Sequence, residues 1–131
     1  MRKFVIASHS TLAQGFKETL EFLTGQGDRV TALCAYVESN EEIDEVVDEL
    51  VRENNEVIVL TDMAGGSVNQ KFFAHISDKI HVIAGLNLPL AMSILLQLDA
   101  PELDLPALVE ESKQQIQYMN KTYTQIDDED E

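Results

Sequence analysis

The sequence predicts an α/β fold, in which a single domain contains an open, mostly parallel four-stranded sheet with helices on both faces. Three observations predict it. Four short apolar runs recur along the 131 residues, and they are nearly continuous rather than alternating, as expected of strands buried on both faces. Segments with the apolar spacing of amphipathic helices separate these runs. Because strands and helices alternate, the connections are crossovers, which join parallel strands.

The predicted strands are rich in β-branched residues, which favour pleated, buried structure. They span residues 3–7, 30–37, 57–60 and 80–84. The first three predicted helices follow the first three strands, and each carries apolar residues at helical spacing. These residues are Leu12, Phe16, Leu20 and Leu23 in the first helix, Ile43, Val46, Val47, Leu50 and Val51 in the second, and Val68, Phe72 and Ile76 in the third. Ser39 or Asn40 is the expected N-cap of the second helix.

Proline marks the start of the last two predicted helices, which span residues 88–98 and 105 to about 123. Pro89 and Pro106 lie in their first turns, where the missing N–H group costs no hydrogen bond. No linker or internal repeat interrupts the chain. We therefore expect one domain over residues 1–123, followed by an acidic, disordered tail over residues 124–131.

Composition argues against several classes of function. The formal net charge of −15 argues against nucleic acid as a partner, because phosphate backbones require a basic surface. The same charge would attract basic partner proteins. No apolar window approaches the length of a membrane span, and the first residues lack the long apolar core of a signal peptide. With Cys34 as the single cysteine, no intramolecular disulfide can form. We therefore expect a cytoplasmic protein.

Polar and glycine-rich sequences follow three of the predicted strands. They are Ser-His-Ser at residues 8–10, Thr-Asp-Met-Ala-Gly-Gly-Ser at 61–67 and Gly-Leu-Asn at 85–87. In an open parallel sheet, ligands bind beyond the carboxyl ends of the strands. We therefore expect these loops to share one edge of the sheet, where His9 can face Asp62.

This combination of residues favours nucleophilic chemistry at the histidine. A carboxylate such as Asp62 could accept a hydrogen bond from one ring nitrogen of His9, which would fix the tautomer and leave the other nitrogen as the nucleophile. Small serines on both sides of His9 would leave the ring accessible to a partner.

The glycine-rich turn favours an anion beside that histidine. Gly65 and Gly66 allow a ligand to approach the backbone closely, and Ser67 opens a helix whose N-terminus attracts negative charge. The hydroxyls of Ser67 and Ser10 could meet the oxygens of a phosphoryl group. A nucleophilic histidine beside such a turn predicts phosphoryl transfer, in which catalysis is mainly positioning and charge stabilisation.

Other chemistries fit these residues less well. Asp62 could itself be a phosphoacceptor, as in response regulators, but the acidic cluster expected at the end of the first strand is absent. The sequence contains no G-x-S-x-G elbow of a hydrolase and no glycine-rich nucleotide motif. His75, expected in the third helix, and His81, expected in the fourth strand, form no metal-ligand spacing. We interpret both as structural and predict no metal site.

Three blocks of sequence resemble the IIA component of the mannose/fructose/sorbose family of the bacterial phosphoenolpyruvate-dependent sugar phosphotransferase system. The first is Ala-Ser-His-Ser at residues 7–10, and the second is Thr-Asp-Met-Ala-Gly-Gly-Ser at 61–67. The third is Val-Ile-Ala-Gly-Leu-Asn-Leu-Pro at 82–89. The resemblance extends from Phe4 to about Tyr118.

The resemblance implies a phosphotransferase that works as a phosphohistidine carrier, without a metal, a nucleotide or another cofactor. His9, oriented by Asp62, would accept a phosphoryl group from HPr through Nε2 and pass it to a IIB component. This transfer would serve sugar uptake through the membrane IIC and IID subunits, with which the protein would associate peripherally. Members of the family are commonly homodimers, and some exchange a C-terminal strand between subunits. The C-terminal segment of this chain could therefore form an extra element that is exchanged in the same way.

Two alternatives remain open at this point. The phosphocarrier subunit of a phosphoenolpyruvate-dependent dihydroxyacetone kinase has a similar histidine, although the Gly-Gly-Ser turn and the Asn-x-Pro block favour the sugar family. A non-catalytic regulatory or binding module could share the fold. The chain also departs from many family members at one position. In those members a proline follows the Gly-Gly-Ser turn, whereas here Val68 does, so the backbone lacks the fixed φ of proline. The sequence does not identify the sugar.

Overall fold

The sheet contains four strands in the order β2-β1-β3-β4, and all neighbouring strands are parallel. The strands are β1 (Lys3–His9), β2 (Val30–Ala35), β3 (Val57–Thr61) and β4 (Ile80–Ala84). In this computed structural model, residues 2–36, 43–52 and 56–122 are described. The predicted α/β class and parallel sheet are confirmed, and β1 continues two residues beyond the predicted strand because Ser8 and His9 pair with β2.

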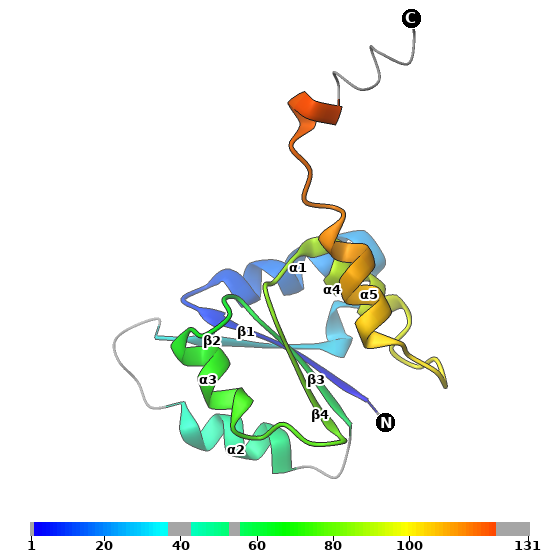
Figure 1. Cartoon of the computed structure of the whole chain (residues 1–131). Helices are drawn as coiled ribbons and strands as arrows, with labels where there is room; N and C mark the ends of the chain where they lie inside the picture. The colour runs from blue at the N-terminus through cyan, green and yellow to red at the C-terminus, as the bar shows by residue number, and fades with distance from the viewer. Residues whose placement is uncertain (1, 37–42, 53–55, 123–131) are drawn as a thin grey trace, which may run out of the picture.

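Helices cover both faces of the sheet (Figure 1). Helices α1 (Leu12–Thr24), α4 (Leu88–Leu96) and α5 (Leu105–Lys113) lie on one side, and α2 (Asp44–Arg52) and α3 (Ser67–Phe73) lie on the other. A short 3₁₀ helix, η1 (Gly27–Arg29), leads into β2. In the described parts of the chain, no helix combines the length and the apolarity that crossing a bilayer requires.

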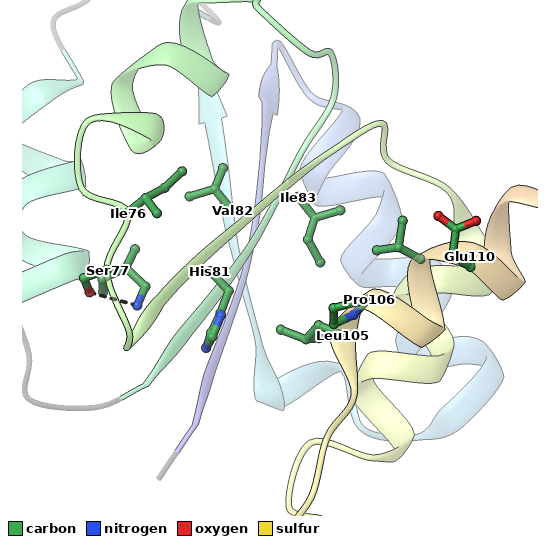
Figure 2. Close-up of a pocket in the computed structure, with 10 residues that line it drawn as sticks. Ile76, Ser77, His81, Val82, Ile83, Leu105, Pro106 and Glu110 are labelled. Carbon is green, nitrogen blue, oxygen red and sulfur yellow. Dashed lines mark hydrogen bonds between the residues drawn. The ribbon is translucent and has the colours of Figure 1, made fainter.

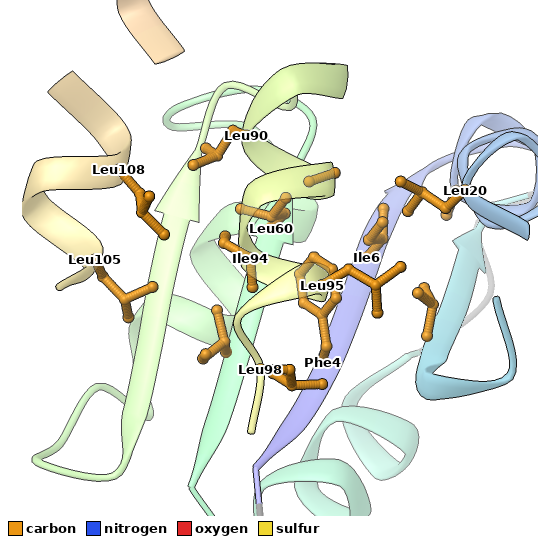
Figure 3. Close-up of a cluster of buried hydrophobic side chains, with 14 residues drawn as sticks. Phe4, Ile6, Leu20, Leu60, Leu90, Ile94, Leu95, Leu98, Leu105 and Leu108 are labelled. Carbon is orange, nitrogen blue, oxygen red and sulfur yellow. The ribbon is translucent and has the colours of Figure 1, made fainter. Parts of the chain in front are cut away.

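Alternate residues of the central strands supply the two halves of the core. Phe4 and Ile6 of β1 pack against α1, α4 and α5 together with Leu20 and Ile94, as Figure 3 shows. Their neighbours on β1 point to the other face and pack against α2 and α3. Strands buried on both faces explain why the apolar runs of the sequence are continuous.

The predicted apolar stripes of three helices need correction. In α1 the buried positions are Ala13 and Leu20, whereas Leu12 is 48% exposed and Leu23 is 46% exposed. Leu20 of the predicted stripe is buried and Phe16 packs against the core, so the prediction is wrong only for Leu12 and Leu23, which lie at the margin of the buried face. Similarly, Val46 of α2 is exposed. The expected caps at residues 39 and 40, like the predicted tail at 124–131, fall outside the described residues.

Helix α3 is also shorter than predicted. It ends at Phe73, so His75 lies in the turn that follows and Ile76 lies outside the helix and is exposed. The imidazole of His75 contacts Asp48 of α2, with 3.3 Å between Nε2 and Oδ1.

The last helix ends at Lys113 rather than near residue 123. Residues 114–122 lead away from the sheet (Figure 1) and form only one further helical turn, at 119–122. Ile116 is 80% exposed and Tyr118 is 74% exposed. A short helix needs packing of an apolar face to persist, and this segment has no such packing against the described core.

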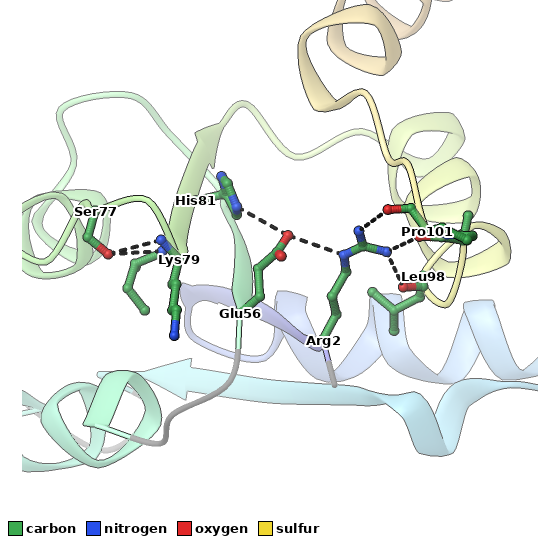
Figure 4. Close-up of polar contacts among 9 residues, drawn as sticks. Arg2, Glu56, Ser77, Lys79, His81, Leu98 and Pro101 are labelled. Atoms are coloured by element: carbon green, nitrogen blue, oxygen red, sulfur yellow. Dashed lines mark hydrogen bonds and ion pairs between the residues drawn. The ribbon is translucent and has the colours of Figure 1, made fainter.

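A polar network closes the amino-terminal end of the sheet, away from the loops of interest (Figure 4). The guanidinium of Arg2 donates to the carbonyls of Leu98, at 2.9 Å, and of Ala100 beyond the end of α4. It also contacts Glu56, with 3.2 Å between Nε and Oε1, and Glu56 in turn contacts His81. This network ties the starts of the strands to the end of α4, which fits the structural role expected for His81.

Candidate functional site

The backbone around His9 makes a sharp exit from the central strand of the sheet. His9 is the last residue of β1, and Ser10 has a left-handed φ of 54°. The Ser10 N–H group donates to the carbonyl of Ala35 at 2.7 Å, which anchors the turn to β2. Helix α1 starts two residues later. The imidazole therefore lies at the carboxyl edge of the sheet, with 36% of the side chain exposed.

The two serines beside His9 differ in their surroundings. Ser8 is fully buried, and its hydroxyl oxygen accepts the N–H group of Ala13 at 2.7 Å. The expectation that both serines keep the ring accessible is therefore wrong for Ser8, which binds an otherwise unpaired amide in the first turn of α1. Ser10 is exposed, but its hydroxyl makes none of the described contacts with the ring.

Asp62 holds both the backbone and the ring of His9. It directly follows β3, and its Oδ2 accepts the backbone N–H of His9 at 2.8 Å and lies 2.9 Å from the ring Nδ1. A carboxylate can only accept hydrogen bonds. The ring proton therefore belongs on Nδ1, and Nε2 carries the free electron pair.

Asp62 is suited to remain ionised at neutral pH. Burial alone raises the pKa of this carboxyl, but the hydrogen bonds from the backbone and ring of His9 outweigh burial, and the net pKa lies below its ordinary value of 3.8. The other oxygen, Oδ1, is buried and has no hydrogen-bond partner among the described residues. Both bonds to His9 thus fall on one oxygen.

Ser67 stands at the nucleophilic nitrogen. As the first residue of α3, it places its hydroxyl oxygen 3.1 Å from Nε2 of His9. With the ring proton on Nδ1, the hydroxyl of Ser67 donates to Nε2. The two nitrogens of the ring are therefore held by the two ends of one loop, which runs from Asp62 to Ser67.

The glycine pair shapes that loop. Gly65 has a φ of 76°, which favours glycine. A Cβ atom on Gly66 would lie 3.5 Å from Cε1 of His9, so a longer side chain there would crowd the ring. The N–H groups of both glycines donate within the loop, to Asn69 at 3.2 Å and to Met63 at 3.3 Å. Because both N–H groups already have partners, they are not free to bind an anion as the sequence suggested. The N–H groups in the first turn of α3 have no partner within the helix.

Two further residues belong to this site and were missed from the sequence. The ring of Tyr36 lies 5.7 Å from that of His9, with 34° between the planes, and Tyr36 has a left-handed φ of 60°. Asn69 is buried and binds the loop from inside. The position of Tyr36 after β2 could have suggested it, because parallel neighbours end at the same edge.

The third predicted loop has a different role. Asn87 caps α4 by accepting the N–H of Leu90 at 2.8 Å, and it donates to the carbonyl of Ser112 in α5 at 3.3 Å. The N–H of Gly85 donates to the carbonyl of Thr61. This loop therefore braces α4 and α5 and brings no described side chain to His9.

The site is suited to group transfer through nitrogen. Over the residues that the structure describes, no group of three or more histidine, cysteine, aspartate or glutamate side chains could hold a metal ion. The chemistry on view is an imidazole with a free electron pair on Nε2, a fixed proton on Nδ1 and a hydroxyl donor beside the nucleophile.

Comparison with family models identifies one family. The family model described as the phosphotransferase system (PTS) fructose IIA component matches residues 3–113. A search of curated proteins found no match.

Three solved structures illustrate the similarity. A candidate permease of the phosphoenolpyruvate-dependent sugar PTS from Klebsiella pneumoniae is 33% identical, with a TM-score of 0.84 and 93% of each chain covered. The PTS IIA protein associated with the fucose utilization operon of Streptococcus pneumoniae is 30% identical, with a TM-score of 0.78, and the match covers 93% of this chain and 96% of that one. Component EIIA from Streptococcus agalactiae is 27% identical, with a TM-score of 0.77 and coverage of 92% and 99%.

Proposed function

The chain belongs to the fructose IIA family of the sugar phosphotransferase system, and from this premise we propose that it is a phosphohistidine carrier. His9 accepts a phosphoryl group from the phosphohistidine of HPr and passes it to a IIB component. The IIB component then phosphorylates a sugar as it enters through the membrane subunits. The carrier works in the cytoplasm and docks peripherally on the permease.

The observation that supports this proposal most strongly is that the two ring nitrogens of His9 have different hydrogen-bond partners. Nδ1 donates to Asp62 at 2.9 Å, and Nε2 faces the hydroxyl of Ser67 at 3.1 Å. In the transfer, a P–N bond forms at Nε2 while the P–N bond to the donor's histidine breaks, and the bonding electron pair returns to the donor's ring. The Nδ1 proton stays in place, so the phosphorylated ring carries positive charge that the Asp62 carboxylate stabilises.

The surrounding residues meet the charge of the phosphoryl group. The hydroxyl of Ser67 turns from Nε2 to a phosphoryl oxygen, and the open amides of the first turn of α3 point to the same region. Ser10 is exposed beside the ring and supplies a second hydroxyl. The lack of a side chain at Gly66 leaves room for the phosphoryl oxygens. Such interactions dominate catalysis of phosphoryl transfer.

A transfer assay tests this function. We expect the purified protein, incubated with phosphoenolpyruvate, enzyme I and HPr, to gain the mass of one phosphoryl group in an acid-labile linkage. Addition of a cognate IIB component should remove this group, whereas a nucleotide-loaded dihydroxyacetone kinase subunit should not. Removal by the kinase subunit instead would favour the kinase phosphocarrier. An unmodified protein beside a demonstrably active donor would leave a binding module as the better description.

We also propose that the carrier is a homodimer, with the edge of the sheet as the contact. Among the described strands, β4 has a neighbour on one side only. A largely apolar groove of about 480 Å³ lies along it, between the loop after α3 and α5. Figure 2 shows Ile76 and Val82 on one side of this groove, with Leu105 and Pro106 of α5 on the other. The occupant is residues 114–122 of a second copy, which carry the exposed apolar side chains of Ile116, Tyr118 and Met119.

Truncation tests the dimer. We expect the full chain to sediment as a dimer and a chain ending at Lys113 to sediment as a monomer, because the truncated chain lacks the exposed apolar residues Ile116, Tyr118 and Met119. A matched control ends at residue 126 and lacks only the five acidic residues 127–131, and it should remain a dimer. A monomeric full chain, or a dimer that survives the longer truncation, would contradict this contact.

A further inference from the structure

We propose that Asn69 is a positioning residue for phosphoryl transfer, because it fixes the loop that aligns both nitrogens of His9. This inference rests on the proposed function but concerns a residue whose side chain bonds to the loop and not to the ring of His9. Asn69 lies in the first turn of α3, with its side chain turned inward beneath the loop that joins Asp62 to Ser67.

The amide of Asn69 bridges the two parts of this loop. Its Nδ2 donates to the hydroxyl oxygen of Thr61 at 2.9 Å, and its Oδ1 accepts the N–H of Gly65 at 3.2 Å. Thr61 is fully buried at the end of β3, and Asn69 is 9% exposed. Because buried polar groups are costly without partners, both bonds should be maintained in the folded protein.

The bridge sets the geometry at the ring because of where its ends lie. Thr61 directly precedes Asp62, which holds Nδ1, and Gly65 lies two residues before Ser67, which faces Nε2. Gly65 itself has the conformational freedom of glycine and a left-handed φ. The bridge therefore restricts a backbone that glycine would otherwise leave flexible. It also links Asp62, on one side of the His9 ring, to Ser67 on the other.

The chemistry of the bridge suits asparagine. One end must donate and the other must accept, across the width of a planar amide. Leucine has a similar volume but offers neither group. Aspartate could accept at both ends if the Thr61 hydroxyl reversed its direction, but it would add a negative charge beside Asp62 and the incoming phosphoryl group.

The test compares four variants by transfer rate at saturating phospho-HPr, by half-saturating donor concentration, by the NMR resonance of the His9 Nδ1 proton and by thermal unfolding. Asn69→Leu removes both hydrogen bonds of the bridge. Thr61→Val removes one of them and leaves the sequence of α3 unchanged. Thr61→Ser keeps the hydroxyl and serves as the rescue. Asn87→Leu is the matched control, since Asn87 also makes two side-chain hydrogen bonds, but between α4 and α5.

We expect Asn69→Leu and Thr61→Val to slow the saturated transfer by about 10- to 100-fold, as misplacement on the order of 1 Å does. The half-saturating donor concentration should change little, and the Nδ1 proton resonance should shift. Thr61→Ser should keep the wild-type rate and resonance. Asn87→Leu should lower the unfolding temperature but leave the rate of the folded protein unchanged.

Two results would overturn the inference. The first is a folded Asn69→Leu protein that keeps the wild-type transfer rate and the wild-type resonance of the Nδ1 proton. If Asn69→Leu does not fold, the same result in Thr61→Val would count instead. The other is an equal loss of rate in the folded Asn87→Leu control. A wild-type protein that accepts no phosphate would overturn the proposed function instead, and the Nδ1 resonance, which needs no donor, would still decide the role of Asn69.

Discussion

Replacement of His9 with alanine should abolish phosphoryl acceptance while the domain stays folded. In the proposed transfer, the imidazole supplies the attacking Nε2. More than a third of the His9 side chain is exposed, and it belongs to neither half of the core. The intact mass after incubation with active phospho-HPr measures the loss, and circular dichroism with thermal unfolding measures the fold.

His75→Ala is the matched control for this experiment. His75 has a similar exposed fraction, 33%, and also contacts an aspartate, with 3.3 Å between Nε2 of His75 and Oδ1 of Asp48. Its ring lies on the turn after α3 and has no part in the loop between Asp62 and Ser67. We expect this variant to accept one phosphoryl group at the wild-type rate. Phosphate on the His9→Ala protein, or its loss from the His75→Ala protein, would place the acceptor elsewhere.

Asp62→Asn should slow phosphoryl transfer by about 100- to 10,000-fold, the range that loss of an orienting aspartate produces in histidine-dependent catalysis. The amide can donate to the ring, which favours a proton on Nε2 and so removes the nucleophilic electron pair. It also lacks the charge that stabilises the phosphorylated ring. The single-turnover rate with phospho-HPr measures the effect.

Acid titration supplies a second readout for the same variant. The pKa of Asp62 is lower in the folded protein than its ordinary value of 3.8, so its ionised form adds stability above that value. This stability is lost as the pH falls through the lowered pKa. The unfolding free energy of Asp62→Asn should therefore fall less steeply in this acid range than that of the wild type. Equal transfer rates or equal acid profiles would show that Asp62 does not orient His9.

The sequence predicted the pairing of His9 with Asp62 for a general reason. His9 ends one buried strand and Asp62 directly follows another, and parallel strands end at the same edge, so topology alone brings the two residues near each other. The same rule placed Ser67 close by, because only a short loop separates it from Asp62. These predictions needed no knowledge of side-chain conformations.

Features that depend on exact packing were not predictable in this way. Leu12 and Leu23 lie at the margin of the buried face of α1, and helical spacing alone does not determine how much of that margin the sheet covers. The sequence places Asn69 just after the Gly-Gly-Ser turn. That its side chain points inward depends on how close it lies to Thr61, which the sequence does not show. The early end of α5 at Lys113 depends on the absence of a packing surface, which apolar residues in a sequence do not reveal.

The shared acceptor atom at Asp62 has a consequence for how the carrier operates. Because one oxygen binds both the backbone N–H and the ring Nδ1 of His9, the ring cannot rotate to offer its other nitrogen without losing a bond. In the proposed transfer, this arrangement favours a single regioisomer of phosphohistidine, and the same atom receives and releases the phosphoryl group. We therefore expect the donor and the acceptor to approach along the same path and to exclude each other. The expected turnover of such a carrier is ping-pong, since the donor must leave before the acceptor can bind.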